Sequence, residues 1–252
     1  MFMRFFQLEI KTEFINEFKK FYEYIVFPKL QRTPGCLFAG LIKSGPKRNE
    51  FVSITFWETK IYAENYENNG KFHELLKEAK PYLTESAEWK IHLFDNSEFE
   101  YAPVSEEPVI KKYAVQARKN EEEKFNISNS NMYVRIVSAK IQEGKIDEFK
   151  RLYSEIIIPQ LKVVKGCEYV YLIESTSEDD EFISLTIWSN KEDADLYEAS
   201  GKFNLLVKNI SHTFSHFYLW KMALEKEYNP QKQPSENMKI EHYDLVTGKS
   251  FV

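Results

Sequence analysis

Apolar residues follow two rhythms along the chain, one with the period of a strand and one with the period of a helix. Residues 2–10 are rich in apolar, β-prone side chains and predict an opening strand. The next segment changes rhythm, because its apolar residues recur three or four positions apart, the spacing of one helix face. These residues are Ile15, Phe18, Tyr22 and Ile25. Pro28 stands near the end of this predicted helix and is expected to kink or close it.

The whole pattern then occurs a second time. Residues 1–93 align without a gap with residues 132–224, at a constant offset of 131 positions, and about a third of the paired positions are identical. The helical face returns as Ile146, Phe149, Tyr153 and Ile156, followed by Pro159. A repeat of this length indicates a duplicated domain, since solenoid repeats span roughly 20 to 50 residues.

Each half continues with a predicted hairpin of two strands. Its strands are residues 37–43 and 51–57 in the first half, and 168–174 and 182–188 in the second. Along the second strand of the first hairpin, Phe51 and Trp57 point to one face and further apolar residues point to the other. Those further residues are Val52, Ile54 and Phe56. An antiparallel strand that is buried on both faces needs helices on one side and a second apolar layer, here the sheet of the duplicate, on the other.

A helix around Tyr66, a break at Gly70, another helix from Phe72 and a last strand through Trp89 complete the module. Its order, β-α-β-β-α-α-β, is a ferredoxin-like arrangement. We therefore predict an α+β protein of two tandem ferredoxin-like domains, packed sheet to sheet as an intramolecular pseudo-dimeric α+β barrel. The expected domains are residues 1–95 and 132–225.

The segments that follow the two modules also repeat each other. The matching pieces are 100–103 with 227–230, and 110–115 with 240–245. In the second pair Ile, Tyr and Val or Leu alternate as on a strand. We expect residues 96–131 and 226–252 to be tail arms that add strands to the barrel or lie over it. Residues 119–131 are charged and polar and are expected to be a flexible linker.

Composition narrows the class of protein. The formal net charge is -5, the pI is near 5.7 and no basic stripe is visible, which argues against nucleic acid as a partner. No signal peptide and no apolar run of membrane-spanning length is recognised, so we expect no membrane partner and a cytoplasmic location. Cys36 and Cys167 stand at equivalent repeat positions and are expected to be reduced, packed thiols.

Sequence motifs for cofactors are missing. The chain has no glycine-rich phosphate loop, no cysteine cluster and no nucleophile elbow. His212 and His216 have the spacing of a helical metal pair, but the first half has Pro81 and Glu85 at those positions and no third ligand is evident. We expect neither a metal nor a cofactor. Any chemistry must then come from an apolar pocket lined by rings and from the substrate itself.

One cluster of motifs carries a family resemblance. Pro34-Gly35, the run from Ser53 to Lys60 that contains Trp57, and then Ala63, Tyr66 and Gly70-Lys-Phe72 resemble the antibiotic biosynthesis monooxygenase family of dimeric α/β barrels. The second half repeats the pattern with Lys165 in place of the proline. The resemblance implies an oxygenase that works without a cofactor, whose strand tryptophan matches Trp57 and Trp188. Ser53 and Ser184 replace that group's asparagine, and Ala63 and Ala194 replace its tyrosine.

The resemblance to haem-degrading members of the same family implies that their iron-ligating histidine aligns with Leu76 and Val207 of this chain. The resemblance therefore disfavours haem as a substrate or cofactor.

The candidate site consists of residues that are aromatic in both halves and fall near the family's site, together with His73. As catalytic candidates we take Trp57, Tyr66, His73, Trp188 and Tyr197, and as ligand-binding candidates Tyr22, Phe72, Tyr153 and Phe203. Each aromatic residue has an alternative role as core filler. We expect a pocket between sheet and helices in each half. We favour the first half as the working one for two reasons. Gly40 aligns with Tyr171 of the second half and leaves more room, and His73 offers a base.

Two arginines complete the set. Arg4 and Arg135 are expected to form cross-strand ion pairs with Glu50 and Glu181.

Three functions remain open at this stage. The first is a monooxygenase acting on a small aromatic or phenolic compound, and the second is a non-catalytic binding protein that uses the same pockets. The third is a structural or interaction protein whose pockets are filled by side chains. The expected assembly is a monomeric pseudo-dimer or a higher homo-oligomer. An open cavity beside Tyr66 and Tyr197 would distinguish the third function from the other two.

Overall fold

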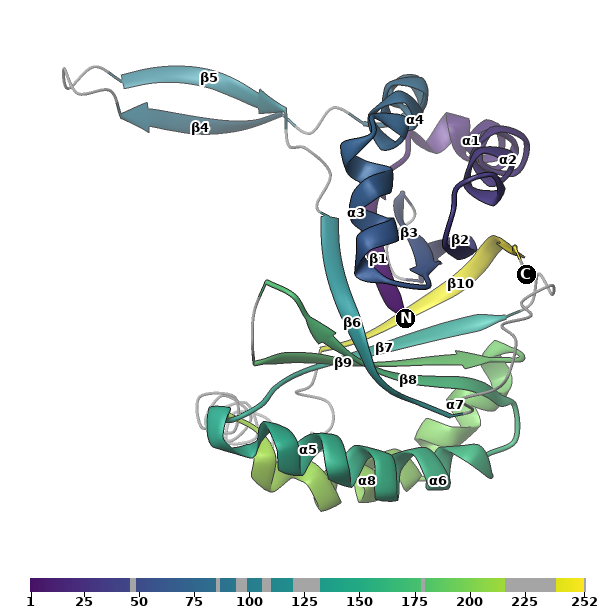
Figure 1. Ribbon diagram of the computed structural model, residues 1–252, viewed down its shortest axis with the longest axis vertical. Coiled ribbons are helices and arrows are strands. Elements are labelled where there is room, and N and C mark those ends of the chain that lie inside the picture. The colour runs from purple at the N-terminus through teal and green to yellow at the C-terminus, as the bar shows by residue number, and fades with distance from the viewer. Residues whose placement is uncertain are drawn as a thin grey trace.

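The computed structural model describes residues 1–45, 49–84, 87–93, 99–105, 110–119, 132–177, 180–215 and 239–251. Both halves have the same succession of elements (Figure 1). The first half contains β1 (Phe2–Glu9), α1 (Ile15–Phe21), α2 (Phe27–Gln31), β2 (Cys36–Ser44), β3 (Glu50–Trp57), α3 (Lys60–Asn68) and α4 (Lys71–Ala79). The second half contains β7 (Tyr133–Lys140), α5 (Ile146–Leu152), α6 (Ile158–Lys162), β8 (Cys167–Ser175), β9 (Glu181–Trp188), α7 (Lys191–Ala199) and α8 (Lys202–Ile210).

The tails supply further strands. These are β4 (Ala87–Leu93), β5 (Phe99–Ser105), β6 (Ile110–Arg118) and β10 (Lys239–Ser250). Single 3-10 turns lie at Thr12–Phe14, Lys80–Tyr82, Glu143–Lys145 and Ser211–Thr213.

Eight strands close into one antiparallel barrel in the order β1-β3-β2-β10-β7-β9-β8-β6. The tail strand β6 lies between β1 of its own half and β8 of the other, and β10 lies between β7 and β2. Each tail therefore forms one of the two seams that join the halves. This arrangement confirms the pseudo-dimeric barrel and the prediction that the tail arms add strands.

One predicted strand has a different partner from the one expected. The strand through Trp89 is β4, which pairs with β5 in a separate two-stranded sheet instead of joining the barrel. The fourth strand of each half's barrel sheet is the tail strand that comes later in the chain. Residues 120–131 of the predicted linker 119–131, and the repeat segment 227–230, lie outside the described residues.

The first helix of each half does not end at its proline. A π-helical stretch, Tyr22–Val26 in the first half and Tyr153–Ile157 in the second, joins the two α-helical pieces. In it the Phe27 N–H donates to the Tyr22 carbonyl five residues back. Pro28 has no N–H and cannot donate a backbone hydrogen bond. The wider π-helical turn shifts the backbone hydrogen bonding around it, and the helix continues to Gln31.

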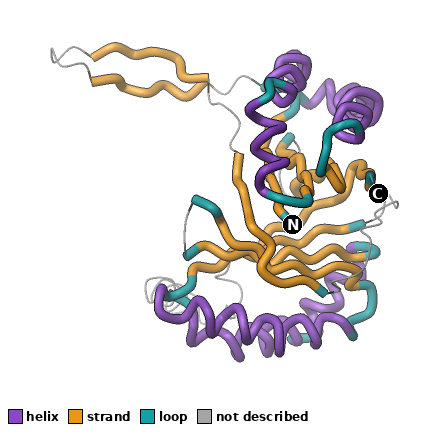
Figure 2. Tube along the Cα trace, viewed as in Figure 1, coloured by secondary structure: helices purple, strands orange, loops and turns teal. Residues whose placement is uncertain are grey.

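The described residues form three hydrophobic clusters. Two lie between a sheet and its helices, one in each half, and the third fills the barrel interior with residues from both halves. Phe51 and Trp57 belong to a helix-side cluster, whereas Val52 and Phe56 belong to the barrel interior, as the alternation predicted. Figure 2 shows the helices on the outside and the barrel strands between them, with the β4–β5 hairpin projecting away.

Candidate functional site

Each half encloses a cavity between its sheet and its helices, on the outer side of the barrel. The space open to the centres of water molecules is about 50 Å³ in the first half and about 40 Å³ in the second. This is room for about three water molecules. A cavity that binds benzene has about 150 Å³, so an aromatic ligand requires the wall side chains to move apart. The two walls are largely built from equivalent residues. The shared wall positions include Phe18 and Phe149, Tyr22 and Tyr153, Tyr66 and Tyr197, Phe72 and Phe203, and Leu75 and Leu206.

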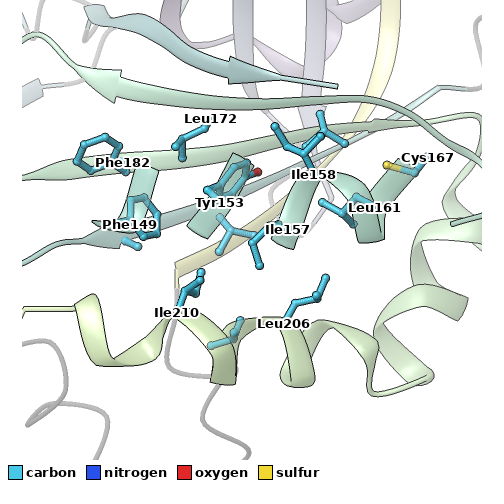
Figure 3. Close-up of a cluster of buried hydrophobic side chains, with 14 of the residues drawn as sticks. Phe149, Tyr153, Ile157, Ile158, Leu161, Cys167, Leu172, Phe182, Leu206 and Ile210 are labelled. Carbon is cyan, nitrogen blue, oxygen red and sulfur yellow. The ribbon is translucent and has the colours of Figure 1, made fainter. Parts of the chain in front are cut away.

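Figure 3 shows the hydrophobic cluster of the second half, which lies between the strands at the top of the view and α8 at the bottom. Tyr153 reaches toward the strands, Phe149 and Phe182 lie beside it, and Leu206 and Ile210 come from α8. Nearly all of this wall is hydrocarbon, so a ligand here gains mainly from burial of apolar surface.

A guanidinium group marks one polar position in each wall. Arg4 on β1 is 3% exposed, and its Nε donates to Glu67 Oε1 of α3 at 2.8 Å. Its Nη2 lies 2.7 Å from the same oxygen without the alignment of a hydrogen bond, and has no hydrogen-bond partner among the described residues. Arg135 has the same arrangement with Glu198, and its Nη2 likewise has no partner there.

The carboxylate partners differ from those that the sequence suggested. In the register of the sheet Arg4 lies opposite Thr55, and Glu50 lies opposite Glu9, so the expected cross-strand pair with Glu50 is wrong. The partner, Glu67, comes from a helix. A sequence signal for it exists, because Arg4 and Glu67 are both kept as Arg135 and Glu198 in the second half.

The guanidinium groups also lie over aromatic rings. The Arg4 Cζ is 4.8 Å from the centre of the Phe72 ring and 5.4 Å from that of Tyr66. The Arg135 Cζ is 4.0 Å from the centre of the Phe203 ring. Cation–π attraction and the carboxylate together hold the cation in an otherwise apolar wall.

Two tyrosines in each wall have different hydrogen-bonding states. The Tyr22 hydroxyl lies 2.8 Å from Ser53 Oγ and donates to the Gly40 carbonyl at 3.2 Å. In contrast, the Tyr66 and Tyr197 hydroxyls have no hydrogen-bond partner within the described part of the chain. Burial raises the pKa of Tyr66 and of Tyr197 far above the ordinary value, and the nearby arginine opposes this only in part. Both hydroxyls therefore stay protonated and can donate to a ligand.

The conserved strand tryptophans stand behind these tyrosines. Trp57 is fully buried, does not line the cavity, and donates from Nε1 to Thr55 Oγ1 at 2.9 Å. Its ring packs on that of Tyr66 with centres 5.1 Å apart, and Trp188 packs on Tyr197 at 5.2 Å. The tryptophans thus position the tyrosines, and the structure does not bring their N–H groups to the cavity.

Other candidates lie elsewhere. His73 is exposed on α4 and does not line the cavity, so it cannot act there as a base. A side chain at Gly40 would meet Phe38 and Leu245, and Tyr171 packs in the barrel interior, so this pair does not decide how much room the cavities have. Both halves have a cavity between sheet and helices, in the expected place.

The positions of the haem-ligand alignment do lie in the walls. Leu76 lines the first cavity and Val207 the second, and neither side chain can ligate iron.

Comparison with known proteins agrees with this architecture. The sequence profile described as antibiotic biosynthesis monooxygenase matches residues 1–78 and again residues 132–208. The chain belongs to the antibiotic biosynthesis monooxygenase family. It is a tandem duplicate of the family's domain, with both copies in one barrel. A search of curated proteins found no match. None of the described helices is both long and apolar enough to cross a membrane.

Solved structures with the same fold cover almost the whole chain. A provisionally assigned monooxygenase from Fusobacterium nucleatum has a TM-score of 0.68 at 9% identity, covering 99% of this chain and 94% of its own. A second one, from Lactobacillus acidophilus, gives 0.66 at 8% identity, with 99% and 96% covered. An anthrone oxidase-like protein gives 0.57 at 11% identity, with 99% and 93% covered. At these identities the likeness shows the fold alone.

The buried tyrosines predict an alkaline limit to stability. Burial raises the pKa of Tyr22, Tyr66, Tyr153 and Tyr197 in the folded chain, so the unfolded chain releases these protons first. Their contribution to stability is complete below the unfolded pKa of about 10 and declines as the pH rises above it. Absorbance at 295 nm should show late-titrating tyrosines that ionise only together with loss of the circular dichroism signal. Ionisation of every tyrosine near pH 10 in a still-folded chain would contradict this.

Proposed function

We propose that this protein is a cofactor-independent monooxygenase that acts on a small phenolic compound bound in its cavities. The observation that carries the proposal is that Arg4 Nη2, which has no hydrogen-bond acceptor among the described residues and lies 2.7 Å from Glu67 Oε1, shares a ring-lined cavity with the Tyr66 hydroxyl. The same pairing recurs in the second half with Arg135 and Tyr197. A buried donor without a hydrogen-bond acceptor is costly, so Nη2 of Arg4 and of Arg135 favours a ligand oxygen that accepts from it.

The chemistry follows from the environment. A phenolic oxygen that accepts from a guanidinium group loses its proton more easily, because the nearby positive charge stabilises the phenolate. The electron-rich phenolate reduces dioxygen, and the proton passes to solvent. One oxygen atom enters the ring para to the hydroxyl, and the product is a quinone. The other oxygen leaves as water with two hydrogens of the substrate, so no outside reductant is needed.

The residues of each cavity divide this work. Apolar walls remove water from the phenolate and from the reduced oxygen species. Arg4 and Tyr66 hold the substrate oxygen, while Trp57 and Thr55 fix the Tyr66 ring from behind. Tyr22 is held by Ser53 and completes the wall.

The test uses 1-naphthol, whose para position is free. The purified protein should consume dioxygen above the rate of spontaneous oxidation and form 1,4-naphthoquinone that carries one labelled atom from 18O2. In the double variant Tyr66→Phe with Tyr197→Phe we expect a loss of about 10- to 100-fold in rate, the size of one hydrogen bond to a charged oxygen. His73→Ala, outside the cavity, is the control and should keep the rate. If the wild-type protein forms no labelled quinone, the oxygenase proposal is wrong.

A non-catalytic binding protein is the second candidate. The open cavities support both candidates over a protein whose pockets are filled. Binding of 1-naphthol without oxygen uptake would favour the second. For either function the proposed location is the cytoplasm, which accords with the two free, buried cysteines.

A further inference from the structure

The tail strands bring a third charged residue to each arginine–glutamate pair, and it differs between the halves. In the first half Lys112 of β6 places its Nζ 2.5 Å from Glu67 Oε2. In the second half His242 of β10 places its Nε2 3.6 Å from Glu198 Oε1. The two residues occupy matching positions of the repeated tails, each one residue before a tyrosine, Tyr113 or Tyr243. One cavity therefore has a permanent cation beside its carboxylate, and the other has a titratable ring.

The surroundings of His242 keep the ring uncharged near neutral pH. From β7 it is faced by Arg135 and by the Tyr133 ring, whose centre is 5.7 Å away. The groups facing it from α7 are Glu198, Asp195 and Lys191. On the side of β2 the contact is a backbone one, in which the Gly45 N–H donates to the His242 carbonyl at 3.1 Å. Burial is the largest influence and lowers the pKa of His242, against the carboxylates, which raise it.

These partners determine the net charge around the arginine of each cavity. In the first half two cations, Arg4 and Lys112, surround one carboxylate and leave an excess positive charge. In the second half a neutral His242 leaves Arg135 and Glu198 balanced. Nη2 of each arginine, which has no hydrogen-bond acceptor among the described residues, therefore meets a ligand in a different electrostatic setting.

We propose that Lys112 and His242 set the charge of the ligand that each cavity takes: an anionic oxygen in the first half and an uncharged oxygen in the second. This inference rests on the proposed function, because it assumes that both cavities bind aromatic compounds. The duplicated chain then holds two sites of different ligand class on one barrel. Lys112 and His242 act through the carboxylate and the arginine, so they are specificity residues and not catalytic ones.

The test compares benzoate with benzamide, which have nearly the same shape and differ in charge. Trp57 and Trp188 stack behind the two cavity tyrosines, so their indole N–H signals in a 1H–15N spectrum report on each half separately. The signals are assigned with Trp57→Phe and Trp188→Phe. At pH 8 the benzoate-to-benzamide affinity ratio at the first site should exceed that at the second by about tenfold, the size of one partly screened charge at close range.

Reciprocal swaps provide the decisive comparison, since each introduces the residue that the other half already tolerates. His242→Lys should raise the benzoate preference of the second site to that of the first at pH 8. Lys112→His should lower the preference of the first site at pH 8 and restore part of it at pH 5. Equal ratios at both sites, unchanged by the swaps, would overturn this inference while leaving the proposed binding intact. Absence of any shift of either indole signal with both compounds would remove the binding itself, and the inference with it.

Discussion

Removal of residues 239–252 should abolish cooperative folding of both halves, and not of the second half alone. The deleted strand β10 pairs with β7 along one edge and with β2 of the first half along the other. Without it both neighbours expose unpaired backbone groups. The barrel interior also loses the buried side chains of Tyr243 and Leu245. We expect the truncated chain to lack a sharp urea transition and to aggregate.

Circular dichroism with urea and sedimentation velocity would measure this effect. The matched control replaces residues 87–105 with a Gly-Ser linker, because β4 and β5 pair only with each other and lie outside the barrel. That control should keep the sharp transition. A truncated chain that retains a folded, monomeric first half would show that the halves are independent domains, contrary to this prediction.

Substitution of Glu67 by alanine should destabilise the fold by about 3 to 5 kcal/mol, the cost of leaving a buried charge without its partner. Arg4 is 3% exposed and Glu67 is 14% exposed, so bulk water has little access to the position of the lost carboxylate. Removing both charges at once, as Arg4→Met with Glu67→Leu, should recover most of the loss, since a buried pair adds little over apolar packing.

Urea denaturation gives the free energies of unfolding for this series. The control is Glu78→Ala, which breaks a pair of similar length: Lys29 Nζ lies 2.6 Å from Glu78 Oε1, but both side chains are over 40% exposed. Exposed pairs contribute about 0 to 1 kcal/mol, so this variant should stay near the wild type. If Glu67→Ala and Glu78→Ala lower the free energy of unfolding by the same amount, the burial of Arg4 adds nothing to the cost of losing its partner, contrary to this prediction.

The sequence predicted the architecture because two independent signals agreed. The repeat showed that one module occurs twice, and the apolar alternation on both faces of residues 51–57 required a second layer. It did not predict which strand closes each sheet, because the segment through Trp89 and the segment at residues 110–115 both have strand character. Their order in the barrel depends on pairing with the other half, which local pattern does not encode.

The site was predicted in part. Tyr66 and Phe72 line the cavity as expected, since residues kept in both copies mark the shared wall. Trp57 was assigned to the cavity because a conserved indole suits either a wall or a core, and only burial distinguishes the two. The partner of Arg4 was missed because Glu67 lies far away in sequence and meets the arginine only after α3 packs on β1. A search for charged pairs kept together in both repeats would have found it.

The seam between β2 and β10 has a consequence for how the chain is made. Phe38 of the first half pairs with Ser250, which comes after the whole of the second half in the chain. A ribosome delivers the chain from its N-terminus at roughly 5 to 20 residues per second, and contacts between distant residues form late. The first half therefore leaves the exit tunnel with the β2 edge of its sheet unpaired, and this edge stays unpaired until β10 emerges. Both copies become native together, so a stalled or prematurely terminated translation product presents an open edge to chaperones and proteases.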